Sequence, residues 1–348
     1  MSAAPRIWLV GFGTVGRWLA EALARAPEHG RIVGIGSARD GFVADPAGID
    51  PEAALALRRA GRPLRDLTGV VGHTDALAGI RAGVAVVLIE AGLSPPADGE
   101  PGRSHMREAL GRGISVVATN KWPVALAGAE LAALAERNGA AFRAESTVMS
   151  GTPLLGPLTE GLAGARPLAI RGVLNATNNF ILTRAGEGAS YEEALAEAQR
   201  RGLAEPDPAA DVDGLDTAAK LMVLSALVFG IPLGLDRVER RGISGLTAAE
   251  LKRARADGLR LREVASLEPA LGGEPLARVE PVALHPGDPL AAIEGTANAL
   301  VCEVEPLGRI TISGPGAGPE LAGQGALADL IEVGRELGRA RVSGERSG

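Results

Sequence analysis

The sequence predicts an α/β fold, with a Rossmann-type, mostly parallel sheet in the first half and a second, α+β domain after it. Strand-like apolar runs alternate with helical patterns over residues 1–148, which is typical of a mostly parallel sheet. A glycine-rich loop directly follows the first of these strands. The alternation ends after Val148, and 348 residues are enough for two domains with separate cores.

The first half consists of short apolar runs separated by helical patterns. Residues 6–10 have the pattern of a buried strand, the loop follows at once, and residues 17–26 have the pattern of a helix. Further strands are expected at 31–36, 84–90, 114–119 and 140–145, and helices at 104–111 and 125–138. We therefore assign residues 1–148 to a dinucleotide-binding domain.

The second half has a different order of elements. Strands are expected at 168–175, 278–284 and 297–305, and helices at 179–184, 190–201, 215–229 and 321–337. Ser190 and Glu193 form a capping box at the start of one of these helices. Residues 204–213 are expected to form an acidic loop and residues 314–318 a tight glycine loop. We expect a disordered tail over residues 341–348.

Composition and charge exclude several classes of function. The net charge of −6 and the 3% aromatic content argue against nucleic-acid binding, which needs clustered positive charge and stacking rings. Cys302 is the single cysteine and the four histidines are scattered, so each histidine is expected on the surface or as a hydrogen-bonded core residue. The longest apolar stretch, residues 221–231, is too short to span a bilayer, and no secretory signal precedes the first strand. We expect a cytoplasmic protein without membrane or nucleic-acid partners.

The glycine-rich loop indicates a dinucleotide site. Its sequence is Gly11-Phe12-Gly13-Thr14-Val15-Gly16. In the dinucleotide fingerprint the first glycine makes the turn, the second admits the pyrophosphate, and the third lets helix and strand pack closely. The position between a strand and a helix favours this interpretation over an ordinary tight turn, because the helix N-terminus supplies free N–H groups.

The end of the second strand is expected to contact the adenosine ribose. Arg39 and Asp40 both lie there. An arginine can pair with the 2′-phosphate of NADP, whereas an acid favours the free 2′-hydroxyl of NAD. Since Arg39 comes first, NADP is favoured over NAD; alternatively, Arg39 is a solvated surface residue.

Lysine is rare in this chain, with three lysines among the 36 Lys and Arg residues. Lys121 follows the strand at 114–119, near the carboxyl end where open sheets bind ligands. Lys252 has the sequence context of a surface residue, and a surface position is also the alternative for Lys121.

Lys220 lies in a helix that is apolar nearly all round and therefore expected to be buried. Asp216 precedes it by four residues and shares its face. A buried ammonium is costly unless paired, and a paired one can donate a proton to a carbonyl oxygen. The sequence thus favours a functional lysine over an exposed i,i+4 ion pair.

Acidic residues precede this helix. Glu205, Asp207, Asp211 and Asp213 lie just before Asp216, in a segment with two prolines. Such a charge run is usually solvated. Next to a buried lysine, it could equally bind the ammonium group of an amino-acid substrate.

These motifs together resemble the homoserine dehydrogenase family. The likeness extends from near Arg6 to about Gly338 and rests on residues 11–16, 120–121, 145–153, 174–182, 202–220 and 314–318. The stretch from Glu205 through Asp216 to Lys220 is its most specific part. The resemblance implies NAD(P)-dependent interconversion of L-homoserine and L-aspartate 4-semialdehyde, in threonine, methionine and isoleucine biosynthesis.

The resemblance also implies roles for single residues. Lys220 matches the acid–base lysine and Lys121 a second active-site lysine. Glu205, Asp216 and Asp211 match substrate-binding acids, and Thr177 matches a residue near substrate and nicotinamide. Asn120 and Gly316 match cofactor-binding positions, to which Lys121 also belongs. Backbone carbonyls of Glu145, Val148 and Ser150 match a monovalent-cation site, for Na or K, of some members.

At the level of domains, the resemblance implies a homodimer. Residues 149–311 match the catalytic and dimerisation domain, and residues 312–340 match a segment that returns to complete the cofactor domain. No C-terminal regulatory domain is expected. Ala176 and Leu203 depart from the family pattern, which usually has glycine at the first position and often an aromatic residue at the second.

Two alternatives stay open at the level of sequence. Another dehydrogenase of amino-acid metabolism, such as an aspartate dehydrogenase, would share the cofactor fold. A cofactor-binding sensor without turnover belongs to a different class, and the combination of Lys121, Glu205, Asp216 and Lys220 argues against it.

Overall fold

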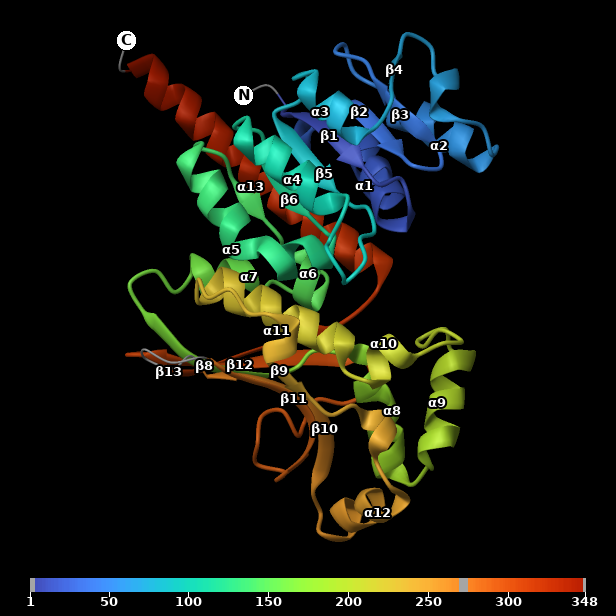
Figure 1. Ribbon diagram of the computed structural model, residues 1–348, viewed down its shortest axis with the longest axis vertical. Helices are drawn as coiled ribbons and strands as arrows, with labels where there is room; N and C mark the ends of the chain where they lie inside the picture. Colours follow the sequence, from blue (N-terminus) through green and yellow to red (C-terminus); the bar gives the residue numbers. More distant parts are fainter. Residues whose placement is uncertain (1–3, 269–274, 347–348) are drawn as a thin grey trace. The chain divides into compact units, whose positions relative to one another are not determined.

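A computed structural model describes residues 4–268 and 275–346 (Figure 1). The chain forms two compact units, one from Met1–Gly151 together with Gly318–Gly348, and one from Thr152–Ala317. Each unit contains its own sheet. No helix in the described ranges is both long enough and apolar enough to cross a membrane.

The first unit is built on a sheet with the order β4-β3-β2-β1-β5-β6-β7. Its strands are β1 (Arg6–Val10), β2 (Arg31–Ser37), β3 (Gly41–Ala44), β4 (Val71–His73), β5 (Val87–Glu90), β6 (Ser115–Ala118) and β7 (Phe142–Arg143). Pairing is parallel from β2 to β7, and β3 and β4 add an antiparallel edge. β5 and β6 are buried throughout, as the predicted apolar runs require. The chain order reverses between β1 and β5, the position where open α/β sheets bind ligands.

Helices from both ends of the chain complete this unit. They are α1 (Thr14–Arg25), α2 (Pro51–Arg59), α3 (Ala76–Arg81), α4 (Gly102–Gly111), α5 (Lys121–Arg137), α6 (Ser146–Met149) and α13 (Pro319–Arg346), with short 3₁₀ turns at Pro27–His29 and Leu64–Asp66. α13 packs against α1, α6 and β6. Its buried Leu330 and Val333 join the same core as Leu9 of β1.

The second unit has a mostly antiparallel sheet of order β13-β12-β8-β10-β11-β9. The strands are β8 (Arg166–Val173), β9 (Val238–Arg240), β10 (Arg260–Glu268), β11 (Leu276–Leu284), β12 (Ala297–Glu305) and β13 (Gly308–Pro315). The helices are α7 (Leu155–Thr159), α8 (Ala176–Glu187), α9 (Tyr191–Arg200), α10 (Ala209–Val212), α11 (Leu215–Val228) and α12 (Ala248–Ala256), with 3₁₀ turns at Leu235–Arg237 and Ile243–Gly245. α8 and α11 both pack against β10 (Figure 1). The predicted capping box between Ser190 and Glu193 is confirmed.

Among the differences from the sequence-based expectation, three concern the acidic loop, the domain boundary and the C-terminal tail. The acidic loop at 204–213 contains the short helix α10. Gly314 and Pro315 belong to β13, which pairs with β12 as far as Pro315, so the segment that joins the first unit begins at Gly318 instead of 312. α13 continues to Arg346 instead of giving way to a disordered tail from residue 341, since no proline follows Pro319 to end it. Residues 347–348 of that expected tail lie outside the described residues.

Candidate functional site

The glycine loop has the geometry of a phosphate cradle. Gly11 has φ +95, and a Cβ there would lie 2.3 Å from the carbonyl oxygen of Ala91 in the loop after β5. A Cβ on Gly16 would lie 2.0 Å from the Gly11 carbonyl oxygen, so close packing of helix and loop requires glycine. A Cβ on Gly13 would meet no atom within 4 Å. The space in front of the α1 N-terminus can therefore receive a pyrophosphate.

The other residues of this loop divide between core and surface. Thr14 is exposed at the start of α1, and Val15 is half-buried. Phe12 is 1% exposed and belongs to the core of the unit. A cofactor contact from Phe12 must therefore come from its backbone.

After the end of β2, Arg39 is exposed whereas Asp40 is buried. Arg39 is exposed in the turn between β2 and β3. Asp40 is buried, where it accepts a 2.6 Å hydrogen bond from Ser37 and forms an ion pair with Arg58. The Asp40 carboxylate is thus engaged within the protein instead of facing a 2′-hydroxyl, whereas the exposed Arg39 can pair with a 2′-phosphate.

Buried polar groups support the loops after β5 and β6. Glu90, the last residue of β5, accepts hydrogen bonds from the Gly92 backbone at 2.9 Å and pairs with His105 Nδ1 at 2.7 Å. His105 is thus a hydrogen-bonded core residue, as predicted. Asn120 is buried and donates to Ser94 at 2.9 Å. Lys121 follows directly as the half-buried first residue of α5, not a loop residue, at the carboxyl end of β6.

Lys220 is the centre of the polar cluster in the second unit. Its Nζ lies 2.8 Å from Asp216 Oδ2 and donates a 2.6 Å hydrogen bond to the Leu174 carbonyl oxygen. The two side chains are 12% and 19% exposed, respectively. The predicted pairing of a largely buried ammonium with Asp216 is confirmed.

Asn175 connects this pair to the acidic segment. Its Nδ2 donates to Asp211 Oδ1 at 2.7 Å and to Asp216 Oδ2 at 3.1 Å. Its Oδ1 accepts from the Asn178 backbone at 2.8 Å and so caps α8. Asp211 lies on α10 and Asp216 in the first turn of α11, so one amide joins the beginnings of three helices.

Two predicted substrate residues lie apart from these hydrogen bonds. Thr177 is buried and donates to the Leu203 carbonyl oxygen at 2.7 Å, which fixes the loop after α9. Glu205 is exposed in that loop, and its side chain has no hydrogen bond or ion pair within the described ranges. Glu205 is therefore available to a ligand but is not brought to Lys220 by protein contacts.

Four residues of this network were not among the predicted site residues: Asn175, Asn178, Thr217 and Glu263. Glu263 of β10 is 2% exposed and accepts from Asn178 at 2.8 Å and from Thr217 at 2.6 Å. The pKa of Glu263 is raised to about 7, mainly by burial and to a smaller extent by Asp216, against the lowering effect of both hydrogen bonds and of Lys220. The polar run at 175–179 inside an apolar region could have indicated the two asparagines. Glu263 has no sequence signal, because it lies in a strand that also contains Arg260, Arg262 and Glu268.

The candidate cation ligands lie around a single helical turn. Glu145 precedes α6, Val148 lies within it and Ser150 follows it with φ 53. The Glu145 backbone N–H donates to Asp329 of α13 at 2.9 Å. In the described residues no three His, Cys, Asp or Glu side chains are grouped to hold a metal ion.

Gly316 and Cys302 both belong to the second unit. A Cβ on Gly316 would lie 2.2 Å from Asn298, so the chain passes close to that side chain. Cys302 is buried, and burial raises the pKa of its thiol to about 11. A thiolate nucleophile at Cys302 is thereby disfavoured.

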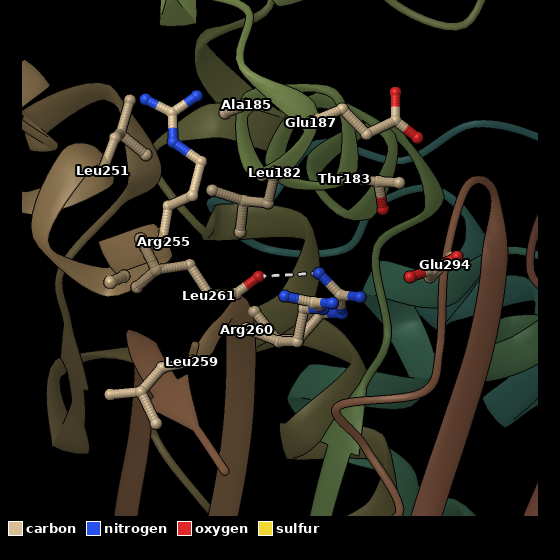
Figure 2. A pocket seen from close by; sticks show the side chains of 13 residues that line it. Leu182, Thr183, Ala185, Glu187, Leu251, Arg255, Leu259, Arg260, Leu261 and Glu294 are labelled. Atoms are coloured by element: carbon tan, nitrogen blue, oxygen red, sulfur yellow. Dashed lines mark hydrogen bonds between the residues drawn. The ribbon is translucent and has the colours of Figure 1, made fainter. Parts of the chain in front are cut away.

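A cavity of about 100 Å³ lies between α8, α12 and the start of β10 (Figure 2). Thr183, Arg255 and Glu294 line it, and no predicted site residue does. The dashed line marks the 2.9 Å hydrogen bond from Arg262 to the Leu261 carbonyl oxygen, and Arg262 donates a second to Ala291 at 3.0 Å. The Lys220 cluster is thus separate from this cavity.

A phosphate cradle at the sheet's switch point and a paired ammonium beside carboxylates define a dinucleotide-dependent oxidoreductase. The family model described as homoserine dehydrogenase matches residues 153–331. The chain belongs to the homoserine dehydrogenase family, and it is an NAD(P)-dependent oxidoreductase that acts on the CH–OH group of homoserine.

Several individual homoserine dehydrogenases are similar to this chain over nearly their full length. An NAD(+)-dependent homoserine dehydrogenase of Pseudomonas canavaninivorans is 38% identical over 94% of this chain and 96% of its own. A homoserine dehydrogenase of Sulfurisphaera tokodaii is 35% identical over 95% and 99%. Among solved structures, a putative homoserine dehydrogenase of Archaeoglobus fulgidus is 31% identical and covers 94% and 99%, with a TM-score of 0.82. A hyperthermophilic archaeal homoserine dehydrogenase in complex with NADPH is also 31% identical and covers 95% and 97%, with a TM-score of 0.79.

Proposed function

We propose that Lys220 is the acid–base residue of homoserine oxidation and aspartate semialdehyde reduction. The observation that carries this proposal is the Lys220 ammonium itself, 12% exposed and 2.8 Å from Asp216. Oxidation of a hydroxyl group requires a proton acceptor, and reduction of the aldehyde requires a donor for the developing alkoxide. A lysine can change its protonation state in this role, whereas an arginine cannot. NAD(P) supplies the hydride chemistry when bound at the glycine loop.

The acids near Lys220 are proposed to bind the substrate. Asp211 and Asp216 are held by Asn175 and present negative charge beside the lysine. Exposed Glu205 is proposed as a further carboxylate for the substrate ammonium group. Thr177 shapes the site by holding Leu203, and Lys121 is assigned as the second active-site lysine.

NADP is the proposed cofactor in preference to NAD. Its pyrophosphate is assigned to residues Gly11–Gly16 and its 2′-phosphate to Arg39, which is exposed while Asp40 is engaged by Arg58. Asn120 and Gly316 are proposed as further cofactor contacts. Relatives support both cofactors, because one is described as NAD(+)-dependent and another was solved with NADPH.

A monovalent cation, Na or K, is proposed at the carbonyl groups of Glu145, Val148 and Ser150. The three residues lie within one short segment around α6, and Ser150 adopts the left-handed region that often marks a functional turn. Turnover is expected to rise with KCl or NaCl and not with choline chloride at equal ionic strength. Equal rates in all three salts would remove this assignment.

We also propose a homodimer that functions in threonine, methionine and isoleucine biosynthesis. Leu168 of β8 and Leu276 of β11 are 39% and 40% exposed on the sheet of the second unit, which offers apolar area to a second copy. Sedimentation equilibrium should give twice the mass of 35.4 kDa. A monomer at micromolar concentration would contradict the dimer.

The experiment that tests the function is absorbance at 340 nm with L-homoserine, run with NADP and NAD in parallel. We expect homoserine-dependent formation of reduced cofactor, faster with NADP at subsaturating concentration. L-aspartate serves as the competing substrate. Turnover with aspartate alone would indicate an aspartate dehydrogenase, and cofactor binding without turnover would indicate a sensor.

A further inference from the structure

Glu263 is a buried carboxyl that the proposed mechanism does not yet use. Its Oε1 accepts from Asn178 and its Oε2 from Thr217, so both oxygens are occupied by neutral donors. No lysine, arginine or histidine forms an ion pair with Glu263 in the ranges that the structure describes. A carboxyl group buried without an opposite charge is costly to ionise, and such groups often serve a function.

Both partners of Glu263 lead directly to the Lys220 cluster. The Asn178 side chain also donates to the Asp211 backbone carbonyl oxygen at 2.8 Å, and the Asn178 backbone N–H donates to Asn175 Oδ1. Thr217 follows Asp216 in the first turn of α11. One carboxyl therefore fixes the start of α8 and the start of α11, the two helices that position the Lys220 ion pair.

The charges that face Glu263 come mainly from α11. Asp216 and Lys220 both act on it electrostatically, with opposite signs. α10 contributes a neutral group, the Asp211 backbone carbonyl, which accepts a hydrogen bond from the same Asn178 amide. On β11 the residue opposite Glu263 is Pro281, which carries no charge.

We propose that Glu263 is a positioning residue for this reaction, which holds Asn178 and Thr217 and whose charge adds to that of Asp216 in stabilising the Lys220 ammonium. The proposal rests on the proposed acid–base role of Lys220. When Glu263 is neutral, Asp216 is the only one of these two carboxyl groups whose charge acts on the ammonium.

The test is the pH profile of kcat for homoserine oxidation by the Glu263→Gln variant of the full-length enzyme. Glutamine keeps the shape and an acceptor for Asn178 but removes the charge. We expect the limb that reports lysine deprotonation to shift to lower pH by about half a unit or more, because a nearby negative charge has been removed. The dissociation constant of NADPH, measured by fluorescence, should stay at the parent value. Glu268→Gln, at the exposed end of the same strand, is the matched control and should leave the profile unshifted.

A second pair of variants keeps the proposal testable if Glu263→Gln fails to fold. Thr217→Val removes one hydrogen-bond donor to Glu263 and thereby keeps its carboxyl group neutral to higher pH. The limb that reports lysine deprotonation should therefore also shift to lower pH, by less than in Glu263→Gln. Thr217→Ser retains the hydroxyl and should restore the parent profile. A folded Glu263→Gln variant with parental kcat and an unshifted profile would overturn the proposal. A failure of the acid–base role of Lys220 is distinguishable from a failure of the Glu263 proposal, because the former appears as near-parental turnover of the Lys220→Ala variant.

Discussion

Replacing Lys220 with alanine removes an ammonium group that lies 2.8 Å from Asp216 and 2.6 Å from the Leu174 carbonyl oxygen. If Lys220 transfers the proton, kcat should fall by about 10²–10⁴-fold, the usual contribution of a positioned acid or base. This corresponds to about 3–5 kcal/mol in the activation barrier. The cofactor dissociation constant should not change, since the glycine loop belongs to the other unit.

The same substitution also weakens the fold, by a smaller amount. The lost interactions are one ion pair and one charge-assisted hydrogen bond, together about 1–3 kcal/mol at a largely buried position. Asp216 keeps the hydrogen bond from Asn175, which limits the cost. Urea denaturation therefore separates the effect on stability from the effect on turnover.

The assay follows absorbance at 340 nm with saturating homoserine and NADP. Lys220→Arg keeps the positive charge but cannot release a proton readily, so it should remain inactive. Lys252→Ala, on the exposed face of α12, is the matched control and should behave as the parent enzyme. A folded Lys220→Ala variant with kcat within tenfold of the parent would refute the assignment.

Three further predictions follow from the two units. Gly13→Val should weaken NADPH binding at least about tenfold in a fluorescence titration without lowering Tm, because no atom lies within 4 Å of the added Cβ and the group occupies the phosphate space; parental affinity would contradict the cradle. Arg39→Ala should reduce the NADP/NAD preference in kcat/KM by about 10- to 100-fold, the effect of one charged hydrogen bond, and an unchanged ratio would exclude Arg39 as the phosphate ligand. The pKa of Glu263 is about 7 in the folded state, against an ordinary value of 4.5. Its contribution to the free energy of unfolding is therefore fully present below about pH 4.5 and is lost as pH rises through about 7. At about 1.4 kcal/mol per pKa unit, the loss amounts to about 3 kcal/mol. In urea denaturation between pH 5 and 8, the free energy of unfolding should fall less for Glu263→Gln than for the parent. Parallel pH dependences for the two proteins would contradict a raised pKa of Glu263.

The sequence alone determined the features that depend on short spacings. The three glycines between a strand and a helix defined the cradle, because each role follows from its place in one turn. Asp216 and Lys220 were paired from their i,i+4 spacing, and the structure confirms the contact.

Only the tertiary structure decided which groups surround that pair. Glu263 lies 46 positions from Thr217 and 85 from Asn178, and its burial depends on how β10 packs against two helices. Glu205 and Asp211 belong to one acidic segment, yet Asp211 is held by Asn175 whereas Glu205 is exposed. Local spacing fixes which face of an element a side chain occupies. The protonation state and partners of a buried acid depend on long-range packing, which a one-dimensional pattern does not contain.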